Sequence, residues 1–480
     1  MLKNAIGELP NGCNIDIMAC NIWWIRRDIR LEDNPALIKA LESGLGVIPL
    51  FIMDPYFQKT GHTPRFAFLI NALRDLDARL RSHNSRLVVR TGQPDEILPQ
   101  VLEESHAVGV FAETDHSPYS RRRDAVMAGK IPLSLVEGPT LIPPGDMLTA
   151  QGNPYQVFTP FYQTWKQRLS VRSSLLTVPE RFPNVKVLET MTLPDISPPV
   201  NFPATRQEAQ RRLDGFLEQD ISLYADQRDR LDLDGTSLLS PYIRFGLLSI
   251  REVFAGIIGR INWDDPETTP GEETWLKELA WREFYQSILL FFPEVLREAF
   301  RPQFRDIPWR DAPEDLLAWQ SGLTGYPVVD AGMRQLMLTG WMHNRARMIT
   351  ASFLVKDLLI NWQAGERWFM QRLVDGDPAS NNGGWQWTAG VGTDAAPYFR
   401  IFNPILQGQK FDPHGVYIRR WVPELADVPE RYIHQTWLMP EILQRDIHCR
   451  IGIDYPLPVV DHKLARRRTL DAFGNKGRKN

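Results

Sequence analysis

The sequence predicts an N-terminal α/β domain with a parallel, Rossmann-like sheet, joined by a long linker to an all-helical domain. Three observations predict it. Five apolar runs alternate with helical patterns over roughly the first 140 residues, proline is frequent between residues 139 and 215, and helical periodicity continues after Arg206. The 480 residues exceed the usual size of one domain, and a hydrophobic fraction of 43% is enough for sizeable cores.

The five apolar runs read as buried strands: NIWWI, GVIPLFIM, SRLVV, AVGVFA and LSLVEG. Between the second and third runs, one apolar stripe recurs at every third or fourth residue: Phe66, Ile70, Leu73, Leu76 and Leu80. Pro64 can open this helix and the following HNS can close it. Strand–helix alternation at this spacing indicates a parallel sheet covered by helices. No G-x-G-x-x-G follows the first strand, which disfavours dinucleotide binding.

The expected organisation has five parts: a flexible leader 1–20, the α/β domain 21–150, an interdomain linker 151–215, the helical domain 216–465 and a basic tail 466–480. The leader has no basic segment followed by an apolar one, so it does not resemble a signal peptide. The tail is expected to be solvated.

Composition narrows the function classes. Lys+Arg number 55 and Asp+Glu 58, so a nucleic-acid partner would need a local basic patch. Cys13, Cys20 and Cys449 form no C-x-x-C pair, so no metal site is expected, and a reducing, cytoplasmic compartment fits. No apolar run reaches the roughly 18 residues that a membrane-spanning helix needs.

Hydroxyl groups gather in TSLLSPY, where Thr236, Ser237 and Ser240 precede Pro241. Serine as N-cap followed by proline is a helix start, and a helix N-terminus beside hydroxyls suits a phosphate group. An ordinary capped helix also explains the pattern.

Two helical segments carry polar groups at helical spacing. The spaced residues are Glu278 with Arg282 and Trp281 with Tyr285 in WLKELAWREFY, and Asn344, Met348 and Ala351 beside Arg347 in WMHNRARMITASF. Taken alone, these patterns are better explained by a surface ion pair over a buried aromatic row and by a helix with a polar edge.

The stretch Asp375–Pro404 is less ordinary, because it combines acids, amides, glycines and large rings. Its features are Asp375, Asp377, Asn381, Asn382, Gly383, Gly384, Trp385 and Trp387. Amides and carboxylates can pair with the edges of a heterocycle, the two glycines allow a tight turn or close backbone approach, and indoles offer stacking planes. This combination predicts a site for a polar aromatic ligand.

Together with GYPVVDAGMRQL, GWMHNRARM, TSLLSPY and ELAWREFY, this stretch resembles the DNA photolyase/cryptochrome family. The resemblance is closest to class I photolyases that repair cyclobutane pyrimidine dimers. It runs from about Asn21, where WWIRRDIRLEDN also matches, to about His462, and it is weaker in the linker.

The resemblance implies one FAD per chain, held folded in the helical domain. The residues it assigns to the cofactor are Tyr224, Thr236, Ser237, Leu238, Leu239, Ser240, Trp275, Arg282, Arg347, Asp375, Gly376, Asp377 and Asn381. Arg347 would pair with Asp375, and the Asn381 amide would face flavin N5.

The resemblance also implies light-driven repair of UV-damaged DNA, in which excited reduced FAD gives an electron to a flipped-out dimer and recovers it. Residues implied near DNA are Arg228, Glu278, Trp281, Arg282, Tyr285, Asn344, Arg345, Met348, Trp387 and Gln407. Glu278 would hydrogen-bond or protonate a thymine carbonyl. Trp385, Trp362 and Trp309 would carry electrons between the flavin and the surface.

Relatives with other functions differ at particular positions. Asn344 and Met348 stand where six-four photolyases have histidines, and Trp387 stands where DASH-type cryptochromes tend to have tyrosine. The alternative function is a cryptochrome-like blue-light photoreceptor with the same FAD pocket. Asn381, and the expected absence of a long tail after Pro404, weigh against it.

An accessory chromophore is expected in the α/β domain, between the loops after NIWWI and AVGVFA. Arg26, Arg27 and Asp28 come from the first loop. Tyr119-Ser120 replaces the Asn-Glu pair of folate-type relatives, which favours 8-hydroxy-5-deazaflavin over methenyltetrahydrofolate. The expected partner is UV-damaged DNA, with no membrane, no obligate protein partner and a monomeric state.

Overall fold

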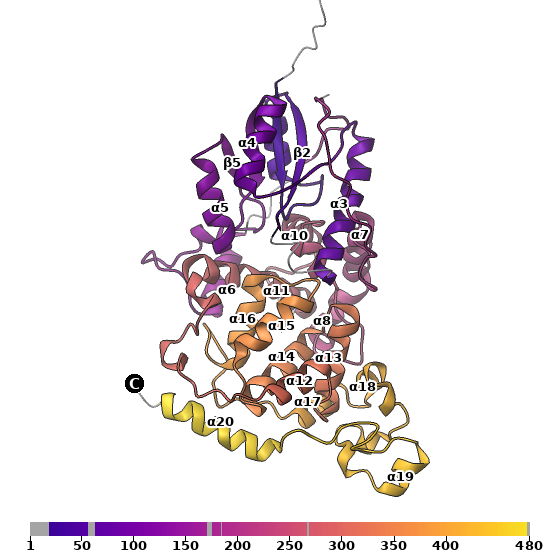
Figure 1. Ribbon diagram of the computed structural model, residues 1–480. Coiled ribbons are helices and arrows are strands. Elements are labelled where there is room, and N and C mark those ends of the chain that lie inside the picture. Colours follow the sequence, from indigo (N-terminus) through magenta and orange to yellow (C-terminus); the bar gives the residue numbers. More distant parts are fainter. Residues whose placement is uncertain (1–18, 56–62, 170–174, 184, 266–267, 478–480) are drawn as a thin grey trace, which may run out of the picture.

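The computed structural model describes residues 19–55, 63–169, 175–183, 185–265 and 268–477, with the α/β domain stacked on the helical domain (Figure 1). Of the predicted leader, residues 1–18 lie outside the described ranges.

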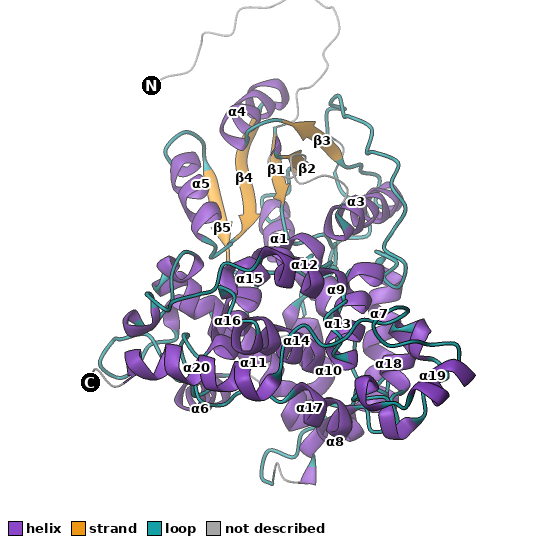
Figure 2. Cartoon of the chain, turned by 60° about the horizontal axis from the view of Figure 1, so that its bottom comes forward, coloured by secondary structure: helices purple, strands orange, loops and turns teal. Residues whose placement is uncertain are grey.

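The predicted parallel sheet is present, and all five apolar runs form its strands. The strands are β1 (Cys20–Ile25), β2 (Gly46–Met53), β3 (Val88–Thr91), β4 (Ala107–Glu113) and β5 (Leu133–Val136). Their order is β3-β2-β1-β4-β5, with every pairing parallel (Figure 2). The chain reverses its direction of winding between β1 and β4, where doubly wound sheets bind ligands.

Successive side chains of the central strand β1 enter two different cores. Trp23 and Ile25 join a core that also includes Phe254 of the helical domain, whereas Ile22 and Trp24 join the core on the other face. This alternation follows from the two-residue period of a strand. One face of the sheet is therefore continuous with the apolar core of the helical domain.

Each of four helices of the α/β domain begins at a proline, which restricts φ to a helical value. They are α1 (Pro35–Leu41), α3 (Pro64–Ser82), α4 (Pro94–Ser105) and α5 (Pro118–Ala128). Each starts with proline, whose φ is already helical and whose missing N–H is not needed there. Asn34, Thr63 and Ser117 cap α1, α3 and α5 by accepting a backbone N–H. The predicted bounds of α3 are thus confirmed.

The part of the described chain that follows the sheet has helices as its regular elements, joined by loops (Figure 1). Its α-helices are α6 (Phe158–Arg168), α7 (Arg206–Gly215), α8 (Tyr224–Gln227), α9 (Ser240–Arg244), α10 (Ile250–Ile258), α11 (Pro270–Phe291), α12 (Pro313–Ser321), α13 (Pro327–Thr339), α14 (Asn344–Ser352), α15 (Trp362–Arg372), α16 (Pro378–Ala389), α17 (Pro404–Phe411), α18 (Val416–Trp421), α19 (Glu441–Asp446) and α20 (His462–Gly477). Two π-helical turns, η2 (Phe216–Asp220) and η7 (Phe353–Asp357), follow α7 and α14 directly.

Two stretches differ from their expected character. Residues 151–215, expected as a linker, contain α6 and α7, because Phe161 and Trp165 of α6 are fully buried in the main core. Residues 466–477, expected in a solvated tail, belong to α20, where Thr469 and Phe473 are completely buried. Phe473, which lies among the basic residues of this helix, packs against Lys356 of η7.

The GYPVVDAGM motif has a structural role that its sequence did not reveal. The fully buried Asp330 accepts hydrogen bonds from the N–H (2.7 Å) and hydroxyl (2.7 Å) of Thr324, the N–H of Gly325 (3.0 Å) and the hydroxyl of Tyr455 (2.5 Å). Gly325 has φ +74°, and a Cβ there would lie 2.4 Å from the Leu457 carbonyl oxygen. The motif therefore fixes the C-terminal segment against α13.

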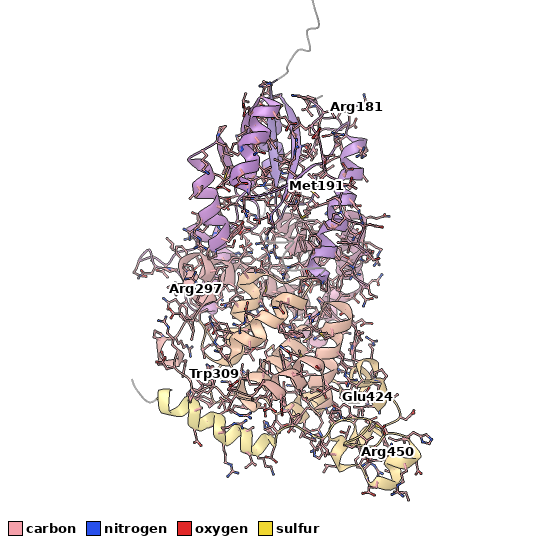
Figure 3. The ribbon with its side chains drawn as sticks, in the orientation of Figure 1. Arg181, Met191, Arg297, Trp309, Glu424 and Arg450 are labelled. Carbon is pink, nitrogen blue, oxygen red and sulfur yellow. The ribbon has the colours of Figure 1, made fainter. Side chains whose placement is uncertain are left out.

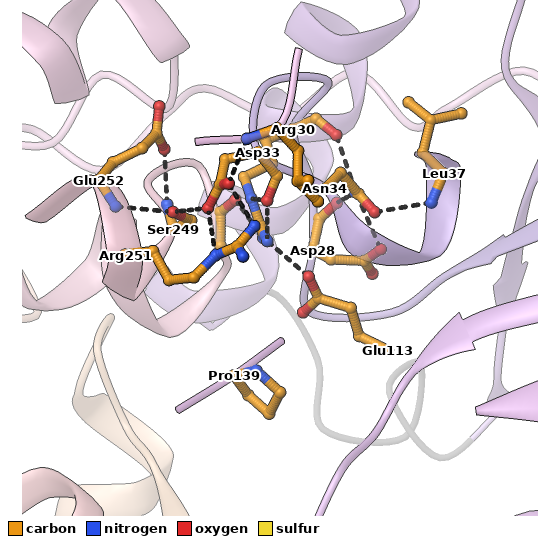
Figure 4. Close-up of polar contacts among 12 residues, drawn as sticks. Asp28, Arg30, Asp33, Asn34, Leu37, Glu113, Pro139, Ser249, Arg251 and Glu252 are labelled. Atoms are coloured by element: carbon orange, nitrogen blue, oxygen red, sulfur yellow. Dashed lines mark hydrogen bonds and ion pairs between the residues drawn. The ribbon is translucent and has the colours of Figure 1, made fainter. Parts of the chain in front are cut away.

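The two domains are joined by buried polar groups (Figure 4). Asp33, after β1, accepts from the Ser249 hydroxyl at 2.5 Å and pairs with Arg251 of α10. Arg30 donates to the Asp33 carbonyl at 3.0 Å and pairs with Glu113 of β4 at 2.5 Å. These contacts hold the β1–α1 loop against the helical domain.

No helix within the described ranges is long and apolar enough to cross a membrane.

Candidate functional site

Asp377 sets the start of α16. Its Oδ1 accepts from the N–H groups of Ala379 (3.0 Å) and Ser380 (3.1 Å), which caps the helix before Pro378. Its Oδ2 lies 2.8 Å from Arg27 Nη2 and 3.5 Å from Arg244 Nε. Burial opposes ionisation, but Arg27 and Arg244 outweigh it, and the pKa of Asp377 lies below its usual value.

Asp375 has one satisfied and one open carboxylate oxygen. Oδ2 lies 2.8 Å from Arg347 Nη2, the expected ion pair, and accepts from the Ser240 hydroxyl at 2.6 Å. Oδ1 is buried and has no hydrogen-bond partner in the described part of the chain. A buried acceptor of this kind suits a ligand that carries a hydroxyl or N–H donor.

The expected cap at Ser240 is wrong. Leu239 takes the N-cap position of α9, and the Ser240 hydroxyl binds Asp375 and accepts from Trp341 Nε1 at 3.3 Å instead. Leu238 has φ +52°, a left-handed conformation uncommon for leucine. Thr236 and Ser237 precede it and are half-buried.

Tyr224 and Trp275 both pack against Phe216. Their ring centroids lie 5.6 and 5.0 Å from the Phe216 centroid, and both side chains are buried. Arg282, assigned to both cofactor and DNA, donates to the Pro139 carbonyl at 2.8 Å and thus lies at the domain junction.

Gly383 of α16 and Gly365 of α15 allow close helix packing, and Gly383 lies within the helix rather than in a tight turn. A Cβ at Gly383 would lie 2.2 Å from Tyr285 Cδ1 on α11, and a Cβ at Gly365 of α15 would lie 2.1 Å from the Trp385 ring. Close approach also lets Asn381 Nδ2 donate to Glu366 Oε1 at 2.9 Å and to the Glu366 carbonyl at 3.1 Å. The Asn381 Oδ1 is the amide atom left for a ligand.

The three tryptophans assigned to electron transfer differ in burial. Trp385 and Trp362 are 2% and 4% exposed, whereas Trp309 is half-buried. Trp309 lies beside α20 (Figure 3), 5.9 Å from the Phe473 ring centroid. The neighbouring Arg310 N–H donates to the Leu359 carbonyl at 2.8 Å, which ties this segment to the turn before α15.

Two ion pairs hold residues assigned to DNA. Glu278 Oε1 lies 2.6 Å from Arg228 Nη1, and burial raises the pKa of Glu278 although Arg228 opposes this. Arg345 lies 2.5 Å from Asp229 Oδ2. Arg228 and Arg345 are thus neutralised in part before any phosphate binds.

Other residues assigned to DNA are partly accessible. Asn344 is exposed, and Met348, Trp281 and Trp387 are half-buried. Gln407 Oε1 is buried without a hydrogen-bond partner in the described ranges.

The sequence analysis did not identify several residues that hold the site together, which are Arg244, Glu366, Trp341 and Asp229. It named Arg27, but not as the partner of Asp377. Arg27 lies 350 positions from Asp377, and no local pattern connects them. The arginine-rich loop WIRRDIR was the one feature of the sequence that could have indicated a basic partner for Asp377.

A small cavity lies where the loops after β1 and β4 meet the helical domain. Its lining is Arg26, Arg27, Glu113, Thr114, Asp115, His116, Pro139 and Gln286. The Arg26 side chain is 7% exposed and binds Asp124 at 2.7 Å, yet its Nε and Nη2 have no partner in the described chain. Asp28 turns inward and accepts from Trp23 Nε1 at 2.9 Å, so it shapes the loop.

Two family models together match most of the chain. Residues 21–184 match the family model described as DNA photolyase, and residues 275–475 match the FAD binding domain of DNA photolyase. The deoxyribodipyrimidine photo-lyase of Escherichia coli (strain K12) is 40% identical over 481 residues, which cover 95% of this chain and 98% of that protein.

Two solved structures are similar over nearly their whole length. A bacterial class III photolyase from Agrobacterium tumefaciens has a TM-score of 0.89 and 36% identity, covering 96% of this chain and 98% of that one. A cryptochrome from Synechocystis sp. has a TM-score of 0.85 and 29% identity, covering 97% and 100%.

The chain belongs to the DNA photolyase/cryptochrome family, with an α/β domain joined to a helical FAD-binding domain. Within this family it is an enzyme, a deoxyribodipyrimidine photo-lyase of the carbon–carbon lyase class. Its closeness to class I remains a prediction.

Adjacent glycines of α16 provide a matched pair of substitutions. Gly383→Ala should lower the free energy of unfolding by about 1–3 kcal/mol, because its methyl group would overlap Tyr285. Gly384→Ala should raise it by about 0.5–1 kcal/mol, because nothing lies within 4 Å and alanine favours a helix. Denaturant titration followed by circular dichroism measures both. Equal effects would contradict the assigned α11–α16 contact.

Proposed function

We propose that this chain repairs cyclobutane pyrimidine dimers in DNA, by light-driven electron transfer from reduced FAD to a dimer flipped out of the duplex. The observation that carries the proposal is Glu278 on α11, a half-buried carboxyl three residues before Trp281 and paired with Arg228. Because the pKa of Glu278 is raised, a larger fraction of this carboxyl is protonated at a given pH, and the protonated carboxyl can donate to a pyrimidine carbonyl. The i,i+3 spacing places an indole beside that donor.

The residues present fit FAD. The open Asp375 Oδ1 can accept from a ribose hydroxyl, and the hydroxyls of Thr236 and Ser237 can bind the pyrophosphate. Asn381, oriented by Glu366, presents Oδ1 to the flavin N5 edge. When bound and reduced, FAD supplies the electron that light makes available to the dimer and receives it back after the bonds split.

Lesion binding would rest on stacking and phosphate contacts. Flipping a damaged pair out of the duplex costs a few kcal/mol, roughly, and an intact pair costs more. Stacking on Trp281 and Trp387 at about 1–3 kcal/mol per base would offset that cost. Arg228 and Arg345, each paired with a carboxylate, would contact backbone phosphates, and Asn344, Met348, Tyr285 and Gln407 would complete the proposed surface. Such contacts make affinity fall with added salt.

The proposal is tested with chemically reduced protein and an oligonucleotide that contains one dimer. We expect blue light to remove the dimer and darkness to leave it. Trp387→Ala should weaken binding of the damaged oligonucleotide by about 1–3 kcal/mol, with unchanged flavin content and unchanged binding of intact DNA. A protein that binds FAD but leaves dimers intact in light would instead fit the photoreceptor alternative.

The half-buried Trp309 generates a separate prediction. Trp309→Phe keeps most of the contact with Phe473 but replaces an oxidisable indole, so photoreduction of bound FAD should become much slower. Repair by chemically reduced protein should stay close to wild type. Transient absorption and the repair assay measure the two quantities, and parallel loss of both would assign Trp309 a structural role.

We also propose an accessory chromophore, 8-hydroxy-5-deazaflavin, in the cavity between the loops after β1 and β4. The Arg26 Nε and Nη2, which have no hydrogen-bond partner in the described chain, can pair with its anionic oxygen, and the exposed Tyr119 ring at the start of α5 is the second group proposed to contact the chromophore. Protein produced without deazaflavin should contain FAD alone and bind added deazaflavin, with energy transfer visible in the excitation spectrum. Tight folate binding with transfer, and none for deazaflavin, would reverse the assignment.

A further inference from the structure

We propose that Phe158 is a positioning residue for lesion recognition, which fixes the plane of Trp281 and leaves one indole face open to a flipped base. The inference rests on the proposed function, because it takes Trp281 as a stacking platform. Phe158 is the first residue of α6, in the stretch expected to be a linker.

Phe158 covers one face of the Trp281 indole. The two ring centroids are 3.7 Å apart and the rings are within 6° of parallel. Phe158 is 8% exposed, whereas Trp281 is half-buried. Phe284 contacts the same indole edge-on, with centroids 5.6 Å apart at 81°. An indole has two faces, so a base can stack on Trp281 only opposite Phe158.

Helix α6 is held firmly against α11, the helix that carries Trp281. Trp165 Nε1 donates to the buried Glu283 of α11 at 2.7 Å. The Tyr162 hydroxyl, one turn before Trp165, donates to Glu273 at 2.7 Å, and Lys166, directly after Trp165, pairs with the same carboxylate at 3.0 Å. Phe158 is therefore placed relative to α11 by contacts along the whole of α6.

Phe158 is also connected to α16, the helix that carries Trp387. Its N–H donates to Asp394 Oδ2 at 3.1 Å, and the neighbouring Thr393 hydroxyl donates to the Gln156 carbonyl. Asp394 has φ +43°, an uncommon conformation for a residue other than glycine. The loop after α16 thus positions Phe158, and Phe158 positions Trp281, which connects the two proposed stacking planes.

This connection affects recognition through conformational entropy. A half-buried indole without a neighbour on one face could change rotamer, and binding a base would then require ordering it. Stacking on Phe158 orders Trp281 before DNA arrives. The preorganised plane should favour a flipped base, and therefore damaged DNA, while leaving backbone contacts with intact DNA unchanged.

The test compares binding of dimer-containing and intact duplexes. Phe158→Leu should reduce the preference for damaged DNA about threefold to tenfold, with unchanged flavin content. Phe158→Tyr keeps the ring and should retain the preference. Phe161→Leu is the matched control, because it removes a buried ring of the same helix that contacts Phe284 rather than the Trp281 face, and it should also retain the preference.

A double-mutant cycle separates this inference from the proposed function. If Trp281→Ala leaves the preference unchanged, the proposed lesion pocket is wrong. If Trp281→Ala abolishes it but Phe158→Leu does not, only the positioning role is overturned. In the Trp281→Ala background, Phe158→Leu should have no further effect, whereas an additive loss would contradict the role. If Phe158→Leu does not fold, Asp394→Ala should weaken the preference and Asp394→Asn should preserve it.

Discussion

The carboxylate of Asp377 is the interaction on which the site depends. One oxygen caps α16 and the other binds Arg27 of the α/β domain, close to Arg244. Without these arginines, the negative charge of the largely buried Asp377 would be uncompensated. The ionised state of Asp377, the start of α16 and the contact between the domains therefore depend on one another. Because α16 carries Asn381 and both Trp385 and Trp387, the direction of this helix sets the positions of residues proposed to contact the cofactor and the lesion.

The domain junction is part of the site. The core of one sheet face continues into the helical domain, and Asp33, Arg30 and Glu113 form its polar edge (Figure 4). The desolvation of buried charges of this kind offsets much of their attraction, so removing one partner would cost more than the intact pair contributes. Arg27 lies at this junction, since it lines the small cavity where the loops after β1 and β4 meet the helical domain and also binds Asp377.

Helix α11 connects the proposed functions through its side-chain spacing. Trp275 is buried against Phe216, Glu278 binds Arg228, and Trp281 stacks on Phe158. Glu283 fixes the same helix to α6, and burial raises its pKa to about 7 although backbone and indole donors favour the carboxylate. A single rigid helix therefore holds side chains whose relative positions a lesion site would require.

The sequence by itself determined the parallel sheet, because strand and helix periods are local, and it located the α16 segment, because that combination of residue types is rare outside a ligand site. It did not determine that Ser240 binds Asp375 rather than capping α9, or that Gly383 makes room for the Tyr285 ring rather than forming a turn. Nor did it determine that α6 and α20 are helices packed against the core. Only the tertiary structure decided these, and the partnership of Arg27 with Asp377. The physical reason is that a hydroxyl, a glycine or a charge can satisfy several partners, and which one it meets depends on contacts between residues far apart in the chain.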